Sequence, residues 1–325
     1  VEDATSVDAR IHANAIATQY EEHKPYGGVV PEIAARAHLD KLDDLIYEAL
    51  RQAGVGLAGL DGIAATCGPG LIGGVMVGAM AGKAMAAVAE KPFVAVNHLE
   101  AHALTARLSH DAQFPYLLLL MSGGHCQIVL VEGVGRFKQL GTTIDDAVGE
   151  CFDKSAKLLG LGYPGGPLME KAAISGDDGA IELPKPLCDR AGCDFSFSGL
   201  KTAVRVKVQK QETPLDSTFI SDMAASLQKT IGDILVNRTS QAFAMLDAPV
   251  TALVVGGGVA ANKVLRDRLT DCALSFKVPF LAPPINLCTD NGVMIAWAGL
   301  ERLRLGRQDD LAFRSRPRWP LEELS

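Results

Sequence analysis

Short apolar runs alternate with stretches of helical periodicity in the first third of the chain. Between Ile33 and Leu50 the apolar residues recur three or four positions apart, and Gly54 follows them, which predicts a helix that ends at this glycine. Apolar runs bounded by turn residues predict strands. The expected elements are strands over residues 9–19, 60–66 and 93–96, with a glycine-rich turn and a helix over residues 75–89 between the last two.

The second half repeats the order strand, glycine turn, helix. Two apolar runs joined by Ser122-Gly123-Gly124-His125 predict a β-hairpin over residues 116–131. Residues 251–269 then echo residues 63–84, which indicates a duplicated α/β protein with two lobes and a cleft between them. Glycines in such turns let phosphate oxygens approach backbone N–H groups at a helix N-terminus, although each turn taken singly is also consistent with a tight connection.

The duplication sets the expected domain boundaries. An N-terminal lobe over residues 1–110 is joined by the C-terminal segment 303–325, and a C-terminal lobe spans residues 111–302. The second lobe opens with a hairpin and the first should do the same, yet only a fragment resembling the second strand of a hairpin precedes Ala13. We therefore expect the first strand and turn to be missing, through truncation or disorder.

The balance of charges is acidic, with 31 Lys and Arg against 38 Asp and Glu and a net charge of −7. Such a chain does not coat nucleic acid or membrane over its whole surface, so a nucleic-acid contact requires a local basic patch or a partner. Six arginines between Arg302 and Arg318 form either such a patch or a solvated tail. Seven scattered cysteines without a CxxC pair are typical of a reducing, cytoplasmic compartment. Residues 70–89 imitate a membrane span but carry few large side chains, so we interpret them as a buried glycine loop and helix.

His98 and His102 lie four residues apart in a segment that favours a helix. Residues at this spacing share one helix face, with Cβ atoms about 5–6 Å apart, so two imidazoles can bind one metal ion. The alternative is one capping and one exposed polar residue. The pair resembles the zincin motif, but Leu99 occupies the place of the zincin glutamate and Glu100 lies on another face, which disfavours a peptidase of that type. Asp290 stands at the start of a later predicted helix and, on its own position, is interpreted as an N-cap.

Several motifs, in their order and spacing, resemble the TsaD family of tRNA N6-adenosine threonylcarbamoyltransferases. The resemblance covers nearly the whole chain, from YGGVVPE near residue 26 to RPRWPLEEL at the end. The segments that carry it are NHLEAH, MSGGH, IDDAVGECFDKSAKLLGLGYPGGP, DFSFSGLKT, GGGVAANKVLR and CTDNGVMIA. It implies an α/β protein with the actin-like, sugar-kinase-like ATPase fold, in which two duplicated lobes surround a nucleotide cleft. Family members usually begin with a strand and an ETSCDET-like turn, which this sequence lacks.

The resemblance also implies the site residues. His98 and His102 match the family's metal-binding histidines, and Asp290 matches its third protein ligand, for one divalent metal ion that is iron or zinc. The MSGGH segment matches the loop that binds threonylcarbamoyl-AMP, and further residues match contacts to the adenine nucleotide. The implied substrate-binding residues are Met121, Ser122, Gly123, Gly124, His125, Asp153, Gly166, Glu170 and Asn262, with Glu170 standing where many members have Asp. No catalytic residue beyond these ligands is assigned.

The implied reaction transfers the threonylcarbamoyl group of threonylcarbamoyl-AMP to N6 of the adenosine directly 3′ of the tRNA anticodon. The family works with a TsaB-like paralogue, as a heterodimer, and with a TsaE-like ATPase, in the cytoplasm and without a membrane. Two alternatives stay open: a metallopeptidase, which an older name of the family proposed, and a non-catalytic scaffold subunit of the same complex. The missing zincin glutamate disfavours the first, and the presence of three metal-ligand residues disfavours the second.

Overall fold

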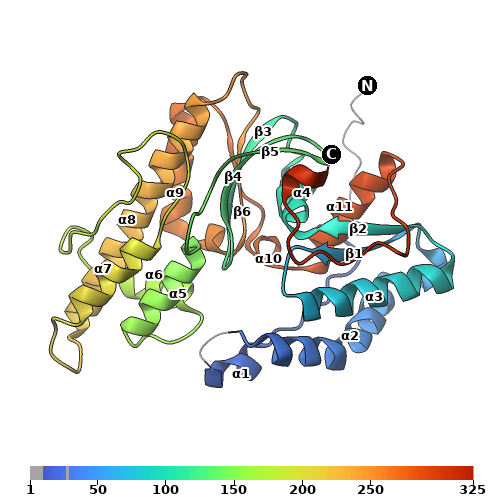
Figure 1. Cartoon of the computed structure of the whole chain (residues 1–325), viewed down its shortest axis with the longest axis horizontal. Helices are drawn as coiled ribbons and strands as arrows, with labels where there is room; N and C mark the ends of the chain where they lie inside the picture. The colour runs from blue at the N-terminus through green and yellow to red at the C-terminus, as the bar shows by residue number, and fades with distance from the viewer. Residues whose placement is uncertain (1–9, 27–28, 325) are drawn as a thin grey trace. The chain divides into compact units, whose positions relative to one another are not determined.

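The structure is a computed structural model that describes residues 10–26 and 29–324 (Figure 1). The chain divides into two compact units. Unit 1 takes in the described residues up to Asp111, the short segment Val134–Arg136 and the chain from Asp290 onward. The segments of unit 2 are Ala112–Gly133 and Phe137–Thr289.

The chain returns to unit 1 earlier than the sequence predicts, at Asp290 rather than at residue 303. The reason is α11 (Gly292–Arg304), which packs on β1 (Ile63–Gly68) and β2 (Phe93–Asn97). A helix that covers these strands belongs with them, whereas periodicity alone does not show which strands a helix covers.

Unit 1 contains two parallel strands, β1 and β2, with helices on both faces. A Cβ atom added to Gly82 of α3 (Ile72–Ala89) would lie 2.8 Å from the Cβ of Ala65, and one added to Gly299 of α11 would lie 2.5 Å from the Cβ of Ala64. Because successive residues of a strand point to opposite faces, α3 and α11 cover opposite sides of β1. The other described elements of this unit are α1 (Tyr20–His23), η1 (Lys24–Tyr26), α2 (Pro31–Ala53), η2 (Leu57–Gly59), α4 (His98–His110) and η4 (Leu321–Leu324).

The helix predicted between Ile33 and Leu50 is confirmed as α2, which packs against α3. Pro31 stands in its first turn, where a missing N–H breaks no helical hydrogen bond. Gly54 adopts a left-handed conformation with φ 69°, and its N–H and that of Val55 bond back to the last turn.

The strand predicted over residues 9–19 is wrong for the part that is described. Residues 10–19 form no regular structure and pair with neither β1 nor β2. The side chains of Ile11 and Ile16 are 48% and 49% exposed, so no core face orders this segment as a strand. Ala9 lies outside the described residues, as does the start of the chain, where the first strand and turn are expected to be missing.

Unit 2 is built on a mixed sheet in the order β5-β4-β3-β6-β7. Its central strand β3 (Tyr116–Met121) is buried along its whole length, with β4 (Cys126–Gly133) antiparallel and β6 (Leu253–Gly256) parallel to it. The β-hairpin predicted over residues 116–131 is therefore confirmed. The remaining elements are β5 (Arg136–Thr142), β7 (Phe280–Leu281), α5 (Val148–Leu158), α6 (Gly165–Ala173), α7 (Ser198–Val208), α8 (Ser217–Ala244), η3 (Gly258–Ala261), α9 (Lys263–Ser275) and α10 (Ile285–Cys288).

The repeat predicted from the sequence corresponds to the same local structure in each unit. β1 and β2 are parallel and connected by α3, and β6 and β7 are parallel and connected by η3 and α9. In both cases a glycine turn follows the first strand, which is the arrangement that exposes backbone N–H groups at the start of a helix.

Among the described residues, α3 is the one helix long and apolar enough, by length and composition, to cross a membrane. One such helix is weak evidence for a membrane, since a core helix of a folded domain has the same composition. Its buried residues are Val75, Ala79, Gly82 and Ala86. A neighbouring side of the helix exposes an apolar stripe formed by Ile72, Met76 and Met80, which are 45%, 50% and 59% exposed. The predicted buried helix is thus buried on one side only.

The close approach of α3 to β1 can be tested with two glycine-to-alanine substitutions on α3, one at the contact and one away from it. Gly82→Ala should lower the free energy of unfolding of unit 1 by about 1–3 kcal/mol, because its new methyl group has no room beside Ala65. Gly78→Ala, where an added Cβ would meet nothing within 4 Å, should raise it by about 0.4–1 kcal/mol. Urea unfolding followed by tryptophan fluorescence measures both, since Trp297 and Trp319 both belong to unit 1. Equal stability of the two variants would contradict this packing.

Candidate metal centre and substrate loop

The two histidines are placed by the junction between β2 and α4. Asn97, the last residue of β2, is the N-cap of α4 and accepts hydrogen bonds from the N–H groups of Leu99 and Glu100 at 2.9 and 3.4 Å. Its side-chain amide donates to the carbonyl of Trp319 at 2.8 Å, which anchors the cap to the C-terminal segment. His98 is therefore the first residue of the helix, and His102 lies one turn later on the same side.

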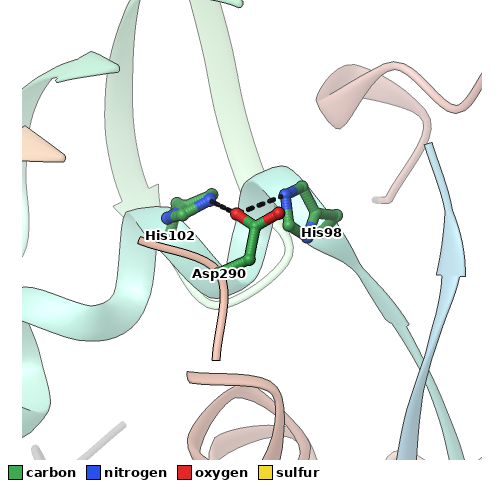
Figure 2. Close-up of side chains that lie close together, drawn as sticks. All are labelled: His98, His102 and Asp290. Carbon is green, nitrogen blue, oxygen red and sulfur yellow. Dashed lines mark hydrogen bonds and ion pairs between the residues drawn. The ribbon is translucent and has the colours of Figure 1, made fainter. Parts of the chain in front are cut away.

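Asp290 closes a triad with this histidine pair (Figure 2). Its Oδ1 lies 3.4 Å from Nε2 of His98 and 3.2 Å from Nε2 of His102, and the two imidazole rings are 4.8 Å apart. The expected N-cap role belongs instead to Asn291, whose side chain accepts from the N–H of Met294 at 2.9 Å. The carboxylate of Asp290 is thus directed at the imidazoles rather than at the helix backbone.

The electrostatics of the triad favour a neutral imidazole and an ionised carboxylate. Burial lowers the pKa of His102, an effect that its hydrogen bond to Asp290 only partly offsets, and the neighbouring His98 lowers it further. The hydrogen bonds with His102 and His98 hold the pKa of Asp290 well below its ordinary value. Neutral imidazole and ionised carboxylate are the forms that bind metal ions.

The donor set of the triad fits a divalent metal ion. One Nε2 from each imidazole and one carboxylate oxygen, all within 4.8 Å of one another, form a ligand set used by zinc and by non-haem iron. The side chain of Asp290 is 78% exposed, whereas that of His102 is only 2% exposed. A site that is fixed on one side and accessible on the other leaves room for an exchangeable ligand.

Glu100, which lies between the two histidines in sequence, points away from them into the core. Its Oε2 lies 2.9 Å from Nε of Arg302 on α11, and the two side chains are 0% and 8% exposed. Burial raises the pKa of Glu100, and the charge of Arg302 counteracts this rise. Glu100 therefore holds α4 against α11, and Arg302 belongs to the core rather than to the basic patch or tail expected from the sequence.

The Ser122–His125 loop at the end of β3 is a closed turn supported by glycines. The N–H of Ser122 donates to the carbonyl of His125 at 2.8 Å, and the N–H of His125 donates to Oγ of Ser122 at 3.0 Å. Cβ atoms added to Gly149 or Gly257 would lie 2.6 Å from the carbonyl oxygen of Ser122 and 2.3 Å from that of Met121, respectively. This close packing fixes both ends of the loop, on either side of Gly123 and Gly124.

The other expected substrate residues form two local groups. Oδ1 of Asp153 accepts from the N–H of Gly165 at 2.7 Å, next to Gly166 at the start of α6. Burial raises the pKa of Asp153, and the N–H groups of Gly165 and Gly166 counteract this rise. Asn262 is the N-cap of α9, with Oδ1 accepting from Leu265 N–H at 3.0 Å.

Glu170 and Asn262 both bind at the start of α9, and Glu170 lines a hollow of about 950 Å³. Oε1 of Glu170 accepts from the N–H of Lys263 at 2.8 Å, and the side-chain amide of Asn262 donates to Gln228 at 2.8 Å. The hollow is lined by Glu170, Lys263 and Gln228, among others. Gln228 was not expected from the sequence, because it lies in the middle of the long helix α8, where no local motif marks it.

Solved structures show the fold class of the chain. A crystal structure of HypF from T. kodakarensis is similar with a TM-score of 0.57 and 14% identity, over 82% of this chain and 43% of that one. HypF in its phosphate- and nucleotide-bound form is similar with a TM-score of 0.50 and 13% identity, over 68% of this chain and 38% of that one. The chain thus spans less than half of either protein. These matches confirm the α/β, actin-like or sugar-kinase-like ATPase fold.

Sequence comparison then shows the family. The family model described as "TsaD: tRNA N6-adenosine threonylcarbamoyltransferase" matches residues 10–297. Two relatives with the same description come from Paramagnetospirillum magneticum (58% identity, 96% of this chain, 91% of the relative) and Rhodospirillum rubrum (59% identity, 96% and 88%). The chain belongs to the TsaD family of tRNA N6-adenosine threonylcarbamoyltransferases.

The buried ion pair between Glu100 and Arg302 can be tested as the contact that holds α4, the helix of the two histidines, in place. Glu100→Ala should lower the free energy of unfolding of unit 1 by about 3–5 kcal/mol, because it leaves the charge of Arg302 buried without a partner. The double variant Glu100→Leu with Arg302→Met should cost clearly less, since no unpaired charge remains. Tryptophan fluorescence during urea unfolding reports both values. A single variant no less stable than the double variant would show that the ion pair does not hold these helices together.

Proposed function

We propose that this chain performs the acyl transfer of its family with a metal ion bound by His98, His102 and Asp290. The proposal is supported above all by the convergence of these three side chains, although Asp290 is 188 residues away from His102 in the sequence. A divalent iron or zinc ion bound there would supply Lewis acidity toward a carbonyl or carboxylate of the threonylcarbamoyl group.

The substrate is threonylcarbamoyl-AMP, held by residues of unit 2. The N–H groups of Gly123 and Gly124 bind the phosphate and stabilise the negative charge that grows on it as AMP leaves. Gly149 and Gly257 keep the loop in the conformation that presents these donors. Asp153 and Gly166 contact the adenylate, and so do Glu170 and Asn262 at the start of α9. The fixed backbone around these residues supports their assignment.

The acceptor is N6 of the adenosine 3′ of the tRNA anticodon. Its exocyclic amine attacks the carbamoyl carbon, the bond to the phosphate oxygen breaks, and AMP departs with the electron pair while N6 loses a proton. This amine is a poor nucleophile, so fixing the two substrates side by side supplies much of the acceleration. An unstacked base of the anticodon loop is accessible to an enzyme, as RNA recognition usually requires.

Neither alternative function is favoured by the site. A metallopeptidase of the zincin type needs a glutamate free to act as a base, whereas Glu100 is fully buried in its ion pair with Arg302. A scaffold subunit has no need of a triad whose electrostatics suit metal binding. We further propose that the chain acts in the cytoplasm.

We also propose that a TsaB-like paralogue binds unit 1 and that a TsaE-like ATPase completes the complex. The exposed apolar stripe of α3, formed by Ile72, Met76 and Met80, supports a partner, because contiguous apolar side chains at a surface mark interaction sites. The net charge of −7 supports it as well, since an acidic chain that acts on tRNA benefits from basic surface on another subunit.

The metal assignment is tested by reconstituting the reaction from the chain, its partner proteins, threonylcarbamoyl-AMP and tRNA. His98→Ala and Asp290→Ala should each lower the yield of modified adenosine by about a hundredfold or more, since even changes around a ligand set cost about 10- to 100-fold. Chelation of the wild-type protein should have the same effect, and added metal should restore activity. Undiminished product from both variants would refute the metal role.

The partner assignment is tested by titrating the TsaB-like paralogue against α3 variants. Met76→Glu and Met80→Glu together should weaken the association by about 30-fold or more, the loss expected when residues central to an interface are changed. Leu274→Glu is the matched control, because Leu274 is 63% exposed but lies on α9 of unit 2. If the control weakens the complex as much as the α3 variants do, the α3 stripe is not the interface.

A further inference from the structure

Arg266 on α9 binds two separate segments of unit 2 with one guanidinium group. Its Nε donates to the carbonyl oxygen of Ala260 in η3. Its Nη2 donates to the carbonyl oxygen of Pro283 at 3.1 Å and also contacts Sγ of Cys288 at 3.4 Å. The planar fork of arginine can hold acceptors on two sides at once, which the single ammonium group of lysine cannot do in the same geometry.

Each of these segments is followed, two residues later in the chain, by a residue to which the proposed function assigns a role. Ala260 is two residues before Asn262, whose carbonyl oxygen also accepts from the N–H of Arg266 at 3.1 Å. Cys288 is the last residue of α10 and lies two residues before Asp290. The side chain of Arg266 therefore anchors the backbone just before Asn262, the proposed adenylate contact, and just before Asp290, the proposed metal ligand.

The segment that leads to Asp290 contains the short helix α10. α10 is only 4 residues long, too short to be stable by itself. The thiol of Cys288 is 1% exposed and donates to the carbonyl oxygen of Pro283 at 3.2 Å, so the segment closes on itself. Arg266 binds both ends of this closed segment and attaches it to α9.

We propose that Arg266 is a positioning residue that sets where Asp290 enters the metal site. This inference rests on the proposed metal-binding function of the triad. Arg266 touches neither metal nor substrate and acts by fixing Pro283 and Cys288. Groups that orient metal ligands from outside the ligand set typically change metal affinity by about 10- to 100-fold when removed.

The test is titration of the full chain with Co²⁺, whose visible absorption reports the ligands around it. Arg266→Met should raise the dissociation constant for Co²⁺ by about 10-fold or more, and Arg266→Lys should raise it by less. Asp290→Ala, which removes the ligand itself, should raise it further. The control Arg205→Met changes an exposed arginine on α7 and should leave the affinity within about twofold of the wild-type value.

The outcomes separate this inference from the proposed function. If Asp290→Ala weakens Co²⁺ binding but Arg266→Met and Arg266→Lys bind as the wild type does, only the role of Arg266 is overturned. If Asp290→Ala also leaves binding unchanged, the metal site and the inference fall together. Should Arg266→Met fail to fold, Arg266→Lys decides: wild-type affinity overturns the proposal, and weaker binding with an altered Co²⁺ spectrum supports it.

Discussion

The buried ion pair between Glu100 and Arg302 is the interaction on which the candidate metal centre depends. It joins α4, which carries both histidines, to α11, which begins two residues after Asp290. The indole N–H of Trp297 on α11 adds a hydrogen bond to the carbonyl of Leu104 on α4 at 3.1 Å. Two charges removed from water stabilise such a contact only while they remain together, so the pair specifies one arrangement of the two helices.

Ligand geometry is set at element ends rather than in loops. Asn97 and Asn291 cap α4 and α11, so His98 and Asp290 are each fixed beside a defined helix start. In unit 2, the backbone around the Ser122–His125 loop is held by glycines that allow strands and helices to approach closely. The proposed metal site and the proposed substrate loop thus both rely on a rigid main chain to place a small number of polar groups.

The sequence predicted much of this arrangement because the signals are local. Periodicity and glycines located α2, the β3–β4 hairpin and the repeated strand–helix units, and the spacing of His98 and His102 predicted a shared face. Long-range contacts carry no such signal: position alone favoured a capping role for Asp290, which the adjacent Asn291 performs. Arg302 resembled a solvated arginine, and only packing shows that it is buried against Glu100.

X-ray absorption at the metal edge measures whether His98, His102 and Asp290 together bind one metal ion. We expect a first shell of imidazole nitrogens and carboxylate oxygen at about 2.0–2.2 Å in the metal-loaded chain. The imidazole signal should fall in His102→Ala. A shell dominated by sulfur at about 2.3 Å, or one unchanged by that substitution, would place the metal elsewhere and rule out this ligand set.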